Sequence, residues 1–458
     1  MILSLRSHGV ECKSWTSFVA SRRRASMLAS APLFCTHART HHRRASTKKK
    51  SPIAMAALPT PESKRTVAIA GGGLVACSCA YFLQKSGLVD VVLVERMPHV
   101  ASAASGKAGG FLARDWGDGT STEPLHKRSF ALHEELAKTL GLETYRKIPT
   151  LSVLGGESLA PPEPIVSWLD GDIQMCRLMD GPDGTAQVTP KELCVKLHAA
   201  ALELGAKSVT GEVTGVAFVD EDAKDKVRGL IVRDENTGET TVVAGDDVVV
   251  AMGPWSTRAS EWFDIDVPMT GIRSTSVVYE ANEAVMREPA ALFCGEDDNG
   301  CHLEVYPRSN GEVYLCGIGG SVYVDEKRLL PGGDCDRSDK IVEDPSRVAA
   351  AMRSFGGMSK SIGGGDKQPH TTQACMRPCA PDAIPILGPV DGIEGAYMAT
   401  AHNCWGILWS PVTGEIITQL ITRGKSDINI APFSPTRFMK SRTRRGRKMR
   451  DENVGEQW

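Results

Sequence analysis

The chain has 458 residues, of which 41% are hydrophobic and 24% are charged, and its formal net charge is −2. These values are typical of a globular protein with about two or three domains and a large core. The 13 cysteines include no CxxC pair, which excludes the common spacings of zinc sites and secreted disulfide frameworks. We therefore expect no metal site and a reducing compartment.

The two ends of the chain are basic. Residues 1–65 carry 13 basic side chains against only Glu11 and Glu62, which is typical of a transit peptide and predicts an organelle, a plastid rather than a mitochondrion. A disordered basic arm on a cytoplasmic protein is the alternative. Residues 436–458 are also basic. Because aromatic residues do not interleave regularly with those charges, we expect a disordered tail and no nucleic-acid partner.

The first element after the leader is an apolar strand predicted over residues 66–70, which ends at three glycines, residues 71–73. A helix over residues 74–83 and a second strand over residues 90–95 follow. The uncharged run from 67 to 83 just reaches the lower limit of a membrane span, about 17 residues, but its glycines and the following strand argue against one. We expect no membrane span, and a strand–helix–strand unit of a doubly wound sheet.

Later segments continue this sheet and add a second domain. Amphipathic segments predict helices, and three consecutive alternating segments predict a β-meander that returns to the sheet. Beyond residue 260 strand patterns dominate, before a last strand and helix close back on the first sheet. The predicted helices are residues 125–140, 190–204, 345–354 and 406–421, and the predicted strands are residues 213–220, 227–234, 240–250, 272–279, 303–306, 312–317 and 395–399.

These patterns predict an α/β fold, in which a Rossmann-like, doubly wound dinucleotide-binding domain is interleaved with a mostly antiparallel β substrate domain. Each domain is assembled from separate stretches, because the patterns switch several times along the chain. The predicted boundaries are 1–65 for the leader, 66–150, 188–259 and 376–435 for the dinucleotide-binding domain, 151–187 and 260–375 for the substrate domain, and 436–458 for the tail.

The glycine turn has the form Gly71-x-Gly73-x-x-Ala76, and Glu95 ends the next strand. Gly71 permits a tight turn, Gly73 lets the backbone approach a pyrophosphate, and Ala76 allows close packing of the helix. The helix N-terminus offers partial positive charge to phosphate, and Glu95 can accept hydrogen bonds from ribose hydroxyls. The spacing therefore predicts a dinucleotide site, while the choice between FAD and NAD stays open at this point.

Five segments, taken in order, identify a family. They are residues 67–76, 102–110 (SAASGKAGG), 247–256 (DVVVAMGPWS), 376–389 (MRPCAPDAIPILGP) and 402–414 (HNCWGILWSPVTG). Over residues 66–435 the chain resembles the D-amino acid oxidase, glycine oxidase and sarcosine oxidase family of FAD-dependent oxidoreductases, and GKAGGFLARDW and HNCWGIL are most similar to a eukaryotic branch of it. The resemblance implies that the cofactor is FAD.

The resemblance also implies which residues contact FAD. In that family a serine-glycine loop lies against the flavin, a strand backbone contacts adenine, and the last helix presents N–H groups to the flavin. Cys375 stands where monomeric sarcosine oxidases attach their flavin covalently, and a buried, unreactive cysteine is the alternative. The expected cofactor residues are Gly71, Gly72, Gly73, Leu74, Val75, Ala76, Glu95, Arg96, Ser105, Gly106, Lys107, Ala108, Gly109, Val213, Ala251, Gly253, Trp255, Cys375, Gly406 and Ile407.

Arg377 is the residue that we expect to hold a substrate carboxylate, because a guanidinium binds that group bidentately and the family places such an arginine at the matching position. The other candidates on the substrate side are Tyr306, His402, Trp405 and Trp116. Aromatic rings can wall an amine pocket, and His402 could act as a base, although hydride transfer from a deprotonated amine needs none. In sarcosine oxidases a lysine is linked to oxygen activation. The matching position here falls near Tyr314, and we find no lysine that replaces it. The choice between an oxidase and a dehydrogenase therefore stays open.

Together these features predict an FAD-dependent oxidoreductase that oxidises the C–N bond of a small amine or amino acid by hydride transfer, with oxygen or another acceptor taking the electrons. Two alternatives remain. One is an FAD-dependent dehydrogenase of a 2-hydroxy acid or an N-methyl compound. The other is a flavin-binding protein that serves trafficking or assembly without turnover.

Overall fold

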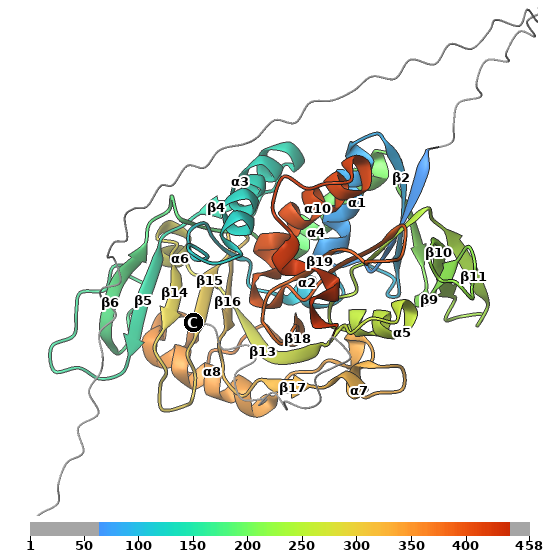
Figure 1. Cartoon of the computed structure of the whole chain (residues 1–458). Helices are drawn as coiled ribbons and strands as arrows, with labels where there is room; N and C mark the ends of the chain where they lie inside the picture. Colours follow the sequence, from blue (N-terminus) through green and yellow to red (C-terminus); the bar gives the residue numbers. More distant parts are fainter. Residues whose placement is uncertain (1–63, 440–458) are drawn as a thin grey trace, which may run out of the picture. The chain divides into compact units, whose positions relative to one another are not determined.

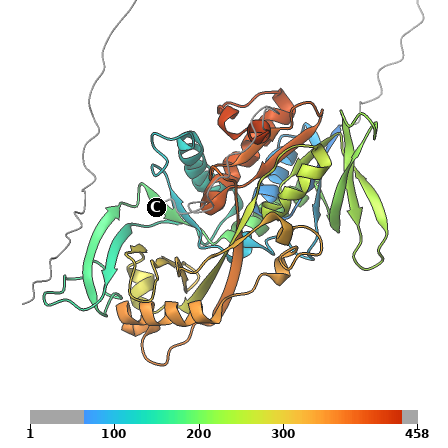
Figure 2. The ribbon, with the colours of Figure 1, turned by 60° about the horizontal axis from the view of Figure 1, so that its bottom comes forward.

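The computed structural model describes residues 64–439. The predicted leader up to residue 63 and the predicted tail from residue 440 lie outside the described residues, so the transit peptide stays a prediction. Within the described part, two large sheets and the layers that pack on them account for the architecture (Figures 1 and 2).

The first sheet has six strands and is built around an apolar strand that directly follows the leader. In spatial order its strands are β19 (Ile386–Pro389), β20 (Ala396–Thr400), β12 (Asp247–Val250), β1 (Arg65–Ala70), β2 (Val89–Glu95) and β8 (Lys207–Thr210). β1 pairs in parallel with β2 and β12, and only β19, at one edge, runs antiparallel. This confirms the doubly wound sheet that the sequence predicts.

Alternate residues of β1 point to opposite faces of this sheet and are buried in two different cores. Val67 and Ile69 pack with a helical layer, whereas Ala68 and Ala70 pack with a small antiparallel sheet. The helical layer consists of α1 (Leu74–Lys85), α3 (Glu123–Leu140), α4 (Pro190–Glu203) and α10 (Gly406–Arg423), and the small sheet consists of β9 (Glu212–Phe218), β10 (Val227–Arg233) and β11 (Thr240–Ala244).

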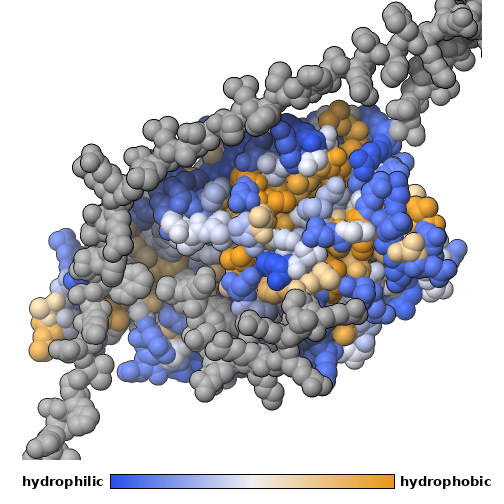
Figure 3. All heavy atoms as spheres, viewed as in Figure 1, coloured by the Kyte–Doolittle hydropathy of each residue, from blue (hydrophilic) through white to orange (hydrophobic). Residues whose placement is uncertain are grey.

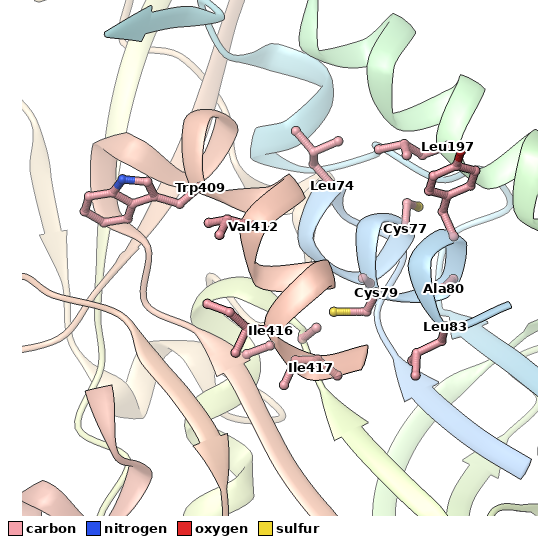
Figure 4. Close-up of a cluster of buried hydrophobic side chains, with 14 of the residues drawn as sticks. Leu74, Cys77, Cys79, Ala80, Leu83, Leu197, Trp409, Val412, Ile416 and Ile417 are labelled. Atoms are coloured by element: carbon pink, nitrogen blue, oxygen red, sulfur yellow. The ribbon is translucent and has the colours of Figure 1, made fainter. Parts of the chain in front are cut away.

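Helices α1 and α10 pack closely in the helical layer. A Cβ on Gly414 of α10 would lie 2.6 Å from the backbone of Ser78 on α1, so a glycine is needed at this crossing. Near this crossing, Ile417 of α10 is buried in the same hydrophobic core as Cys79 and Leu83 of α1 (Figure 4). The close approach fixes the last helix of the fold against the helix that follows the glycine turn.

Helix α10 is also held at its first turn by α3. Pro411 lies inside α10 and has no N–H, so it leaves a carbonyl group of that turn without a helical partner. Nε2 of His133 lies 3.1 Å from the carbonyl oxygens of Ile407 and Leu408, and the Ser129 hydroxyl donates to the carbonyl of Leu408. Burial lowers the pKa of His133 to about 4, so its imidazole is neutral and can donate from Nε2.

The second sheet has eight strands and is mostly antiparallel, since only the pair β5–β14 is parallel. Its strands are β17 (Val322–Val324), β13 (Thr270–Glu280), β16 (Glu312–Cys316), β15 (Glu304–Pro307), β14 (Ala291–Cys294), β5 (Thr150–Gly155) and β6 (Ile173–Asp180), with β18 (Thr371–Cys379) paired to β13. Helix α8 (Pro345–Met358) covers one face, where Phe355 packs with Val277 and Leu315.

The remaining elements are short. A third sheet consists of β3 (Phe111–Ala113), β7 (Thr185–Gln187) and β4 (Arg146–Lys147). The short helices are α2 (Ala104–Lys107), α5 (Ala259–Phe263), α6 (Glu283–Arg287), α7 (Glu326–Leu329) and α9 (Lys360–Gly363), and the 3-10 turns are η1 (Gly253–Arg258), η2 (Ser338–Lys340), η3 (Asn403–Trp405), η4 (Ala431–Phe433) and η5 (Pro435–Phe438).

The strand predicted over residues 240–250 is wrong in one respect, because it is two strands, β11 and β12, in different sheets. The chain changes sheets at Gly245 and Asp246. A Cβ on Gly245 would lie 2.8 Å from the Cβ of Ala68, and the Asp246 carboxylate accepts a hydrogen bond of 2.8 Å from the N–H of Thr66. At these two residues the chain passes close to β1 and leaves one sheet for the other, which interrupts the predicted strand.

Two predicted domain boundaries fall inside elements of the structure. Residues 436–438, assigned to the tail, belong to η5, where Arg437 pairs with Asp382 at 2.8 Å, so this part of the predicted tail is structured. β18 runs through the boundary predicted between residues 375 and 376 and pairs with β13 along its whole length. The limits of the domains as folding units stay predictions.

The surface mixes apolar and hydrophilic residues. On the face shown in Figure 3, hydrophilic residues separate the apolar ones into patches. Some apolar side chains are exposed on the edge strand β6, where Leu178 and Met179 are 62% and 52% exposed. No helix within residues 64–439 combines the length and the apolar character that crossing a bilayer requires.

Candidate functional site

A large cavity extends between the glycine turn after β1 and the face of the second sheet opposite α8. Its volume is about 480 Å³, which is within the usual range of small-molecule sites, roughly 300–1,000 Å³. The lining continues along the loop of residues 102–110 and the end of β12 to side chains of β15, β16 and β18. The cavity therefore connects the predicted dinucleotide site with the predicted substrate residues.

The glycine turn forms the first end of the cavity. Gly71 has a φ of +110°, and a Cβ there would lie 2.5 Å from the carbonyl oxygen of Ala251, so only glycine fits. The turn leads into α1, whose first turn carries no acidic residue, and the N–H of Leu74 donates to Ser105 Oγ at 2.8 Å. The partial positive charge of the α1 N-terminus is thus directed at the cavity. The predicted residues that line this end are Gly71, Gly72, Gly73, Leu74 and Val75.

Glu95 lines the cavity beside the turn, at the end of β2. Its Oε1 accepts a hydrogen bond of 2.8 Å from the N–H of Met97, and burial raises the pKa of its carboxyl group. A Cβ on Gly72 would lie 2.8 Å from this side chain, so the glycine makes room for the acid. The position suits the predicted contact with ribose hydroxyls.

Arg96 belongs to a cluster of ion pairs that the sequence does not reveal. Its guanidinium lies 3.5 Å from the carboxylate of Glu212 and 2.6 Å from that of Glu235, and Arg258 lies 3.0 Å from Glu212. Glu212 is almost completely buried and directly precedes Val213, the predicted adenine contact, which also lines the cavity. The cluster therefore fixes the start of β9 against the end of β2.

Most of the other predicted cofactor residues lie along the same cavity. They are Ser105, Ala108, Gly109, Ala251, Gly253, Trp255, Cys375, Gly406 and Ile407. Two of these backbone segments are held by side chains of other elements: Arg308 donates to the carbonyl of Ala108 at 2.8 Å, and Thr400 donates to the carbonyl of Gly253 at 2.9 Å. Gly406 and Ile407 form the first turn of α10, which carries no acidic residue.

Three predicted cofactor residues do not line this cavity. Ala76 is fully buried in the core beneath α1, as its predicted packing role requires. Gly106 lies against Ala101, where an added Cβ would be 2.0 Å from the carbonyl oxygen. The carbonyl of Lys107 accepts a hydrogen bond of 3.1 Å from Gln373 on β18, so this residue joins the loop to the second sheet.

The second end of the cavity is a face of the second sheet. Strand alternation puts Glu304 and Tyr306 of β15 on the same face, opposite Cys316 and Tyr314 of β16, and all four line the cavity. The residues between them, such as Val305, are buried against α8 on the other face. The sheet therefore presents polar groups to the cavity and apolar groups to its own core.

Arg377 on β18 adds a guanidinium to this end of the cavity. It is half-buried, and it makes no ion pair with any residue between 64 and 439. Burial opposes its charge, but the neighbouring groups of Cys404, Cys375 and Glu304 leave its pKa above the ordinary value. Arg377 is therefore a charged group at the cavity wall that lacks a close anionic partner.

Aromatic rings wall the same end. The ring centroid of Trp116 lies 5.1 Å from that of Phe111, 5.0 Å from Phe293 and 6.2 Å from Trp405. Phe111 and Tyr306 are stacked, with centroids 5.5 Å apart and an interplanar angle of 11°. All five residues line the cavity. Such a wall excludes water and can contact a cationic amine.

His402 lines the cavity, but its environment limits its chemistry. Its Nε2 lies 2.9 Å from Oγ1 of Thr413, and burial lowers its pKa to about 3. An imidazole of such low basicity is a poor general base near neutral pH. Burial also raises the pKa of Cys375, which works against the thiolate that a covalent bond to flavin requires.

Glu304 is the main site residue that sequence reasoning missed. It is a carboxyl group, only 9% exposed, that lines the cavity near Arg377. The signal was present in the segment LEVYP, because Glu304 stands two residues before the candidate Tyr306 and must share its face of the strand. Glu212 and Arg258 were missed because their partners come from distant parts of the chain.

The fold and the cavity define a dinucleotide-binding protein. The profile of the family described as "DAO: FAD dependent oxidoreductase" matches residues 66–420, and the chain belongs to this family. Its cofactor is therefore FAD. The residues fit this group, since the glycine turn, the α1 N-terminus and Glu95 suit the adenosine and pyrophosphate parts and the α10 N-terminus faces the cavity farther along.

Individual relatives agree with this assignment. The Schizosaccharomyces pombe protein C1F5.03c, named as an oxidoreductase, is 26% identical over 385 residues, which is 79% of this chain and 95% of that protein. The glycine oxidase of Geobacillus kaustophilus is 26% identical over 259 residues, which is 56% of this chain and 59% of that protein.

Solved structures show the same fold. The glycine oxidase of Geobacillus kaustophilus has a TM-score of 0.61 at 21% identity, covering 82% of this chain and 99% of that one. The L-amino acid deaminase of Proteus myxofaciens, solved with anthranilate, has a TM-score of 0.64 at 17% identity, covering 84% and 95%.

Proposed function

We propose that this FAD-dependent oxidoreductase oxidises the C–N bond of a small amine or amino acid. The observation that supports the proposal most strongly is Arg377, a guanidinium at the cavity wall with no ion-pair partner in the described part of the chain. A charge in such a place is stabilised by an anionic partner, and a substrate carboxylate can supply one with bidentate geometry.

The other parts of the cavity have complementary roles in this proposal. The rings of Phe111, Trp116 and Phe293 exclude water and position the carbon chain beside the nitrogen. The first turn of α10 lines the cavity and carries no acidic residue, so its N–H groups would stabilise negative charge on a reduced flavin. FAD held in this cavity would supply a hydride acceptor, and the imine left on the substrate would hydrolyse in water.

The names of two relatives support the substrate class. The glycine oxidase and the L-amino acid deaminase are both named for amino-acid substrates, and each carries the same fold over most of its length. With Arg377 in the cavity, they favour an amino acid over an amine without a carboxylate.

An anaerobic screen tests the proposal. Purified full-length protein is mixed with glycine, sarcosine, proline, D-amino acids and a matched panel of 2-hydroxy acids, and flavin absorbance is followed. We expect an amino acid to bleach the flavin and to yield the corresponding oxo acid. Peroxide release after admission of air identifies oxygen as the acceptor, and its absence identifies a dehydrogenase. Bleaching by hydroxy acids alone would contradict the proposal.

A further inference from the structure

The polar end of the cavity contains an acid that the proposed function does not yet use. Glu304 is buried and lines the cavity on β15, among aromatic rings. A buried carboxylate is costly unless hydrogen bonds and a cation compensate it. The groups that hydrogen-bond to Glu304, and the charged groups near it, therefore indicate what the residue binds.

The hydrogen-bond partners of Glu304 are neutral. The Tyr306 hydroxyl donates to its Oε2, and the Cys316 thiol donates to the same oxygen at 3.4 Å. Both donors come from fixed positions of the sheet, since Cys316 is the cross-strand neighbour of Glu304 and Tyr306 lies two residues further along β15. These bonds orient the carboxyl group without supplying positive charge.

The guanidinium of Arg377 interacts with Glu304 without pairing with it. Arg377 attracts the carboxylate, but the two side chains do not form an ion pair, although both line the cavity. Burial raises the pKa of Glu304, and the Tyr306 and Cys316 hydrogen bonds together with the charges of Arg377 and His302 oppose that rise. The other titratable groups that interact with it are Cys294 and Cys404.

Arg377 and Glu304 thus present a guanidinium and a carboxyl group to one cavity, without an ion pair between them. A zwitterionic amino acid carries the complementary charges on adjacent atoms, with its carboxylate suited to the guanidinium and its ammonium suited to the carboxylate. A 2-hydroxy acid offers no cation to Glu304. A second carboxylate on the substrate near Glu304 would be repelled.

We propose that Glu304 binds the amino group of an α-amino acid whose carboxylate Arg377 holds, and that it accepts a proton from that ammonium before the C–N bond is oxidised. The N–H proton passes to a carboxylate oxygen, and the electron pair of that bond stays on nitrogen as the lone pair of the free amine. The raised pKa of Glu304 supports this role, because it narrows the gap to the pKa of an ammonium group. The inference rests on the proposed function and adds a substrate class to it.

Matched ligands test the inference on the wild-type protein. Glycine is compared with glycolate, and proline with tetrahydro-2-furoate, by anaerobic titration of the flavin absorbance at neutral pH. Each pair differs mainly in its amine. We expect half-saturation by the amine at a concentration about 10- to 100-fold lower than by its oxygen analogue, as for a hydrogen bond to a charged group. Equal binding within both pairs, or no response to either amine, overturns the inference.

Variants test the residue. Glu304→Gln keeps the size of the side chain and removes its charge, and should abolish the preference for the amine within each pair. Glu280→Gln removes an exposed acid at the end of β13 and should leave the preference intact. If Glu304→Gln loses flavin, Tyr306→Phe provides a second variant, because it removes one hydrogen bond to the carboxyl group and should reduce the preference. An unchanged preference in the flavin-containing variant refutes the role of Glu304.

The two proposals can fail separately. If an amino acid bleaches the flavin but Glu304→Gln still prefers amines, the proposed function stands and the role of Glu304 falls. If no amine bleaches the flavin but the amine preference disappears in Glu304→Gln, Glu304 binds amines and the proposed oxidation falls.

Discussion

The two ends of the cavity are built in different ways. At the glycine turn, backbone groups form most of the cavity wall. Gly71 leaves room for the carbonyl group of Ala251, and the N–H of Leu74 donates a hydrogen bond to Ser105 Oγ. At the second sheet, side chains from β15, β16 and β18 provide the polar groups. The first end depends on a short local sequence, whereas the second depends on the register of strands far apart in the chain.

The largest expected effect concerns the backbone end. Gly71→Ala should prevent stoichiometric FAD binding, because its Cβ would lie 2.5 Å from the Ala251 carbonyl oxygen and its φ is +110°. Gly119→Ala is the matched control, since φ there is +77° and no atom lies within 4 Å of an added Cβ. The control should cost about 1–2 kcal/mol of stability and keep its flavin. Flavin content and thermal unfolding measure both effects, and a Gly71→Ala protein with full flavin would contradict the account.

The next effect concerns the side-chain end. Arg377→Met should leave FAD binding intact and reduce kcat/KM for an amino acid by about 2–5 kcal/mol in transition-state stabilisation, as for truncating one partner of a buried charge pair. Arg287→Met, at an exposed arginine of α6, should change neither quantity. A loss of flavin in Arg377→Met, with unchanged kinetics in the fraction that retains it, would place this residue with the cofactor instead.

The sequence predicts the backbone end well for a physical reason. The turn Gly71-x-Gly73, the helix after it and Glu95 at the end of the next strand are needed within one contiguous segment, so their spacing predicts their geometry. The environment of the Glu304 carboxyl group is set by a tyrosine two residues away and by Cys316 and Arg377 from other strands. Glu212 is held by Arg96, directly after β2, and by Arg258 of η1. Such partnerships follow from strand register, which the local patterns do not determine.

The fold shows the same contrast. Strand and helix patterns predict most elements, because apolar periodicity is local. The break of the predicted 240–250 strand depends on how closely Gly245 passes Ala68 of β1, which is a tertiary contact.

His133, which contacts the first turn of α10, predicts an effect of pH on stability. Burial holds the pKa of His133 at about 4 in the folded protein, against 6.5 ordinarily, so the unfolded chain binds the extra proton first. The free energy of unfolding should therefore fall as pH decreases from 6.5 towards 4, by up to about 3 kcal/mol from this residue.

Substitution isolates that contribution. His133→Gln keeps a hydrogen-bond donor but does not titrate, so its stability should depend less on pH than that of the wild type. His99→Gln, at an exposed position, serves as the control. Urea unfolding at pH 7 and pH 5 measures the difference, and parallel pH dependence in all three proteins would show that His133 does not contribute.

The smallest expected effect sharpens the assignment of the side-chain end. Burial raises the pKa of Cys375, so we expect no thioether to flavin. Acid precipitation of the wild type should leave a colourless pellet and release the flavin, and Cys375→Ala should retain full flavin content. A yellow pellet that becomes colourless in Cys375→Ala would establish a covalent bond.

The most direct test of the central claim, that this cavity binds FAD between the glycine turn and Arg377, is reconstitution of the full-length protein. Protein stripped of flavin is titrated with FAD, and flavin absorbance is recorded before and after adding an amino acid without oxygen. The account predicts stoichiometric uptake and a spectrum that responds to the amino acid. A protein that unfolds cooperatively but remains colourless at saturating FAD would contradict it.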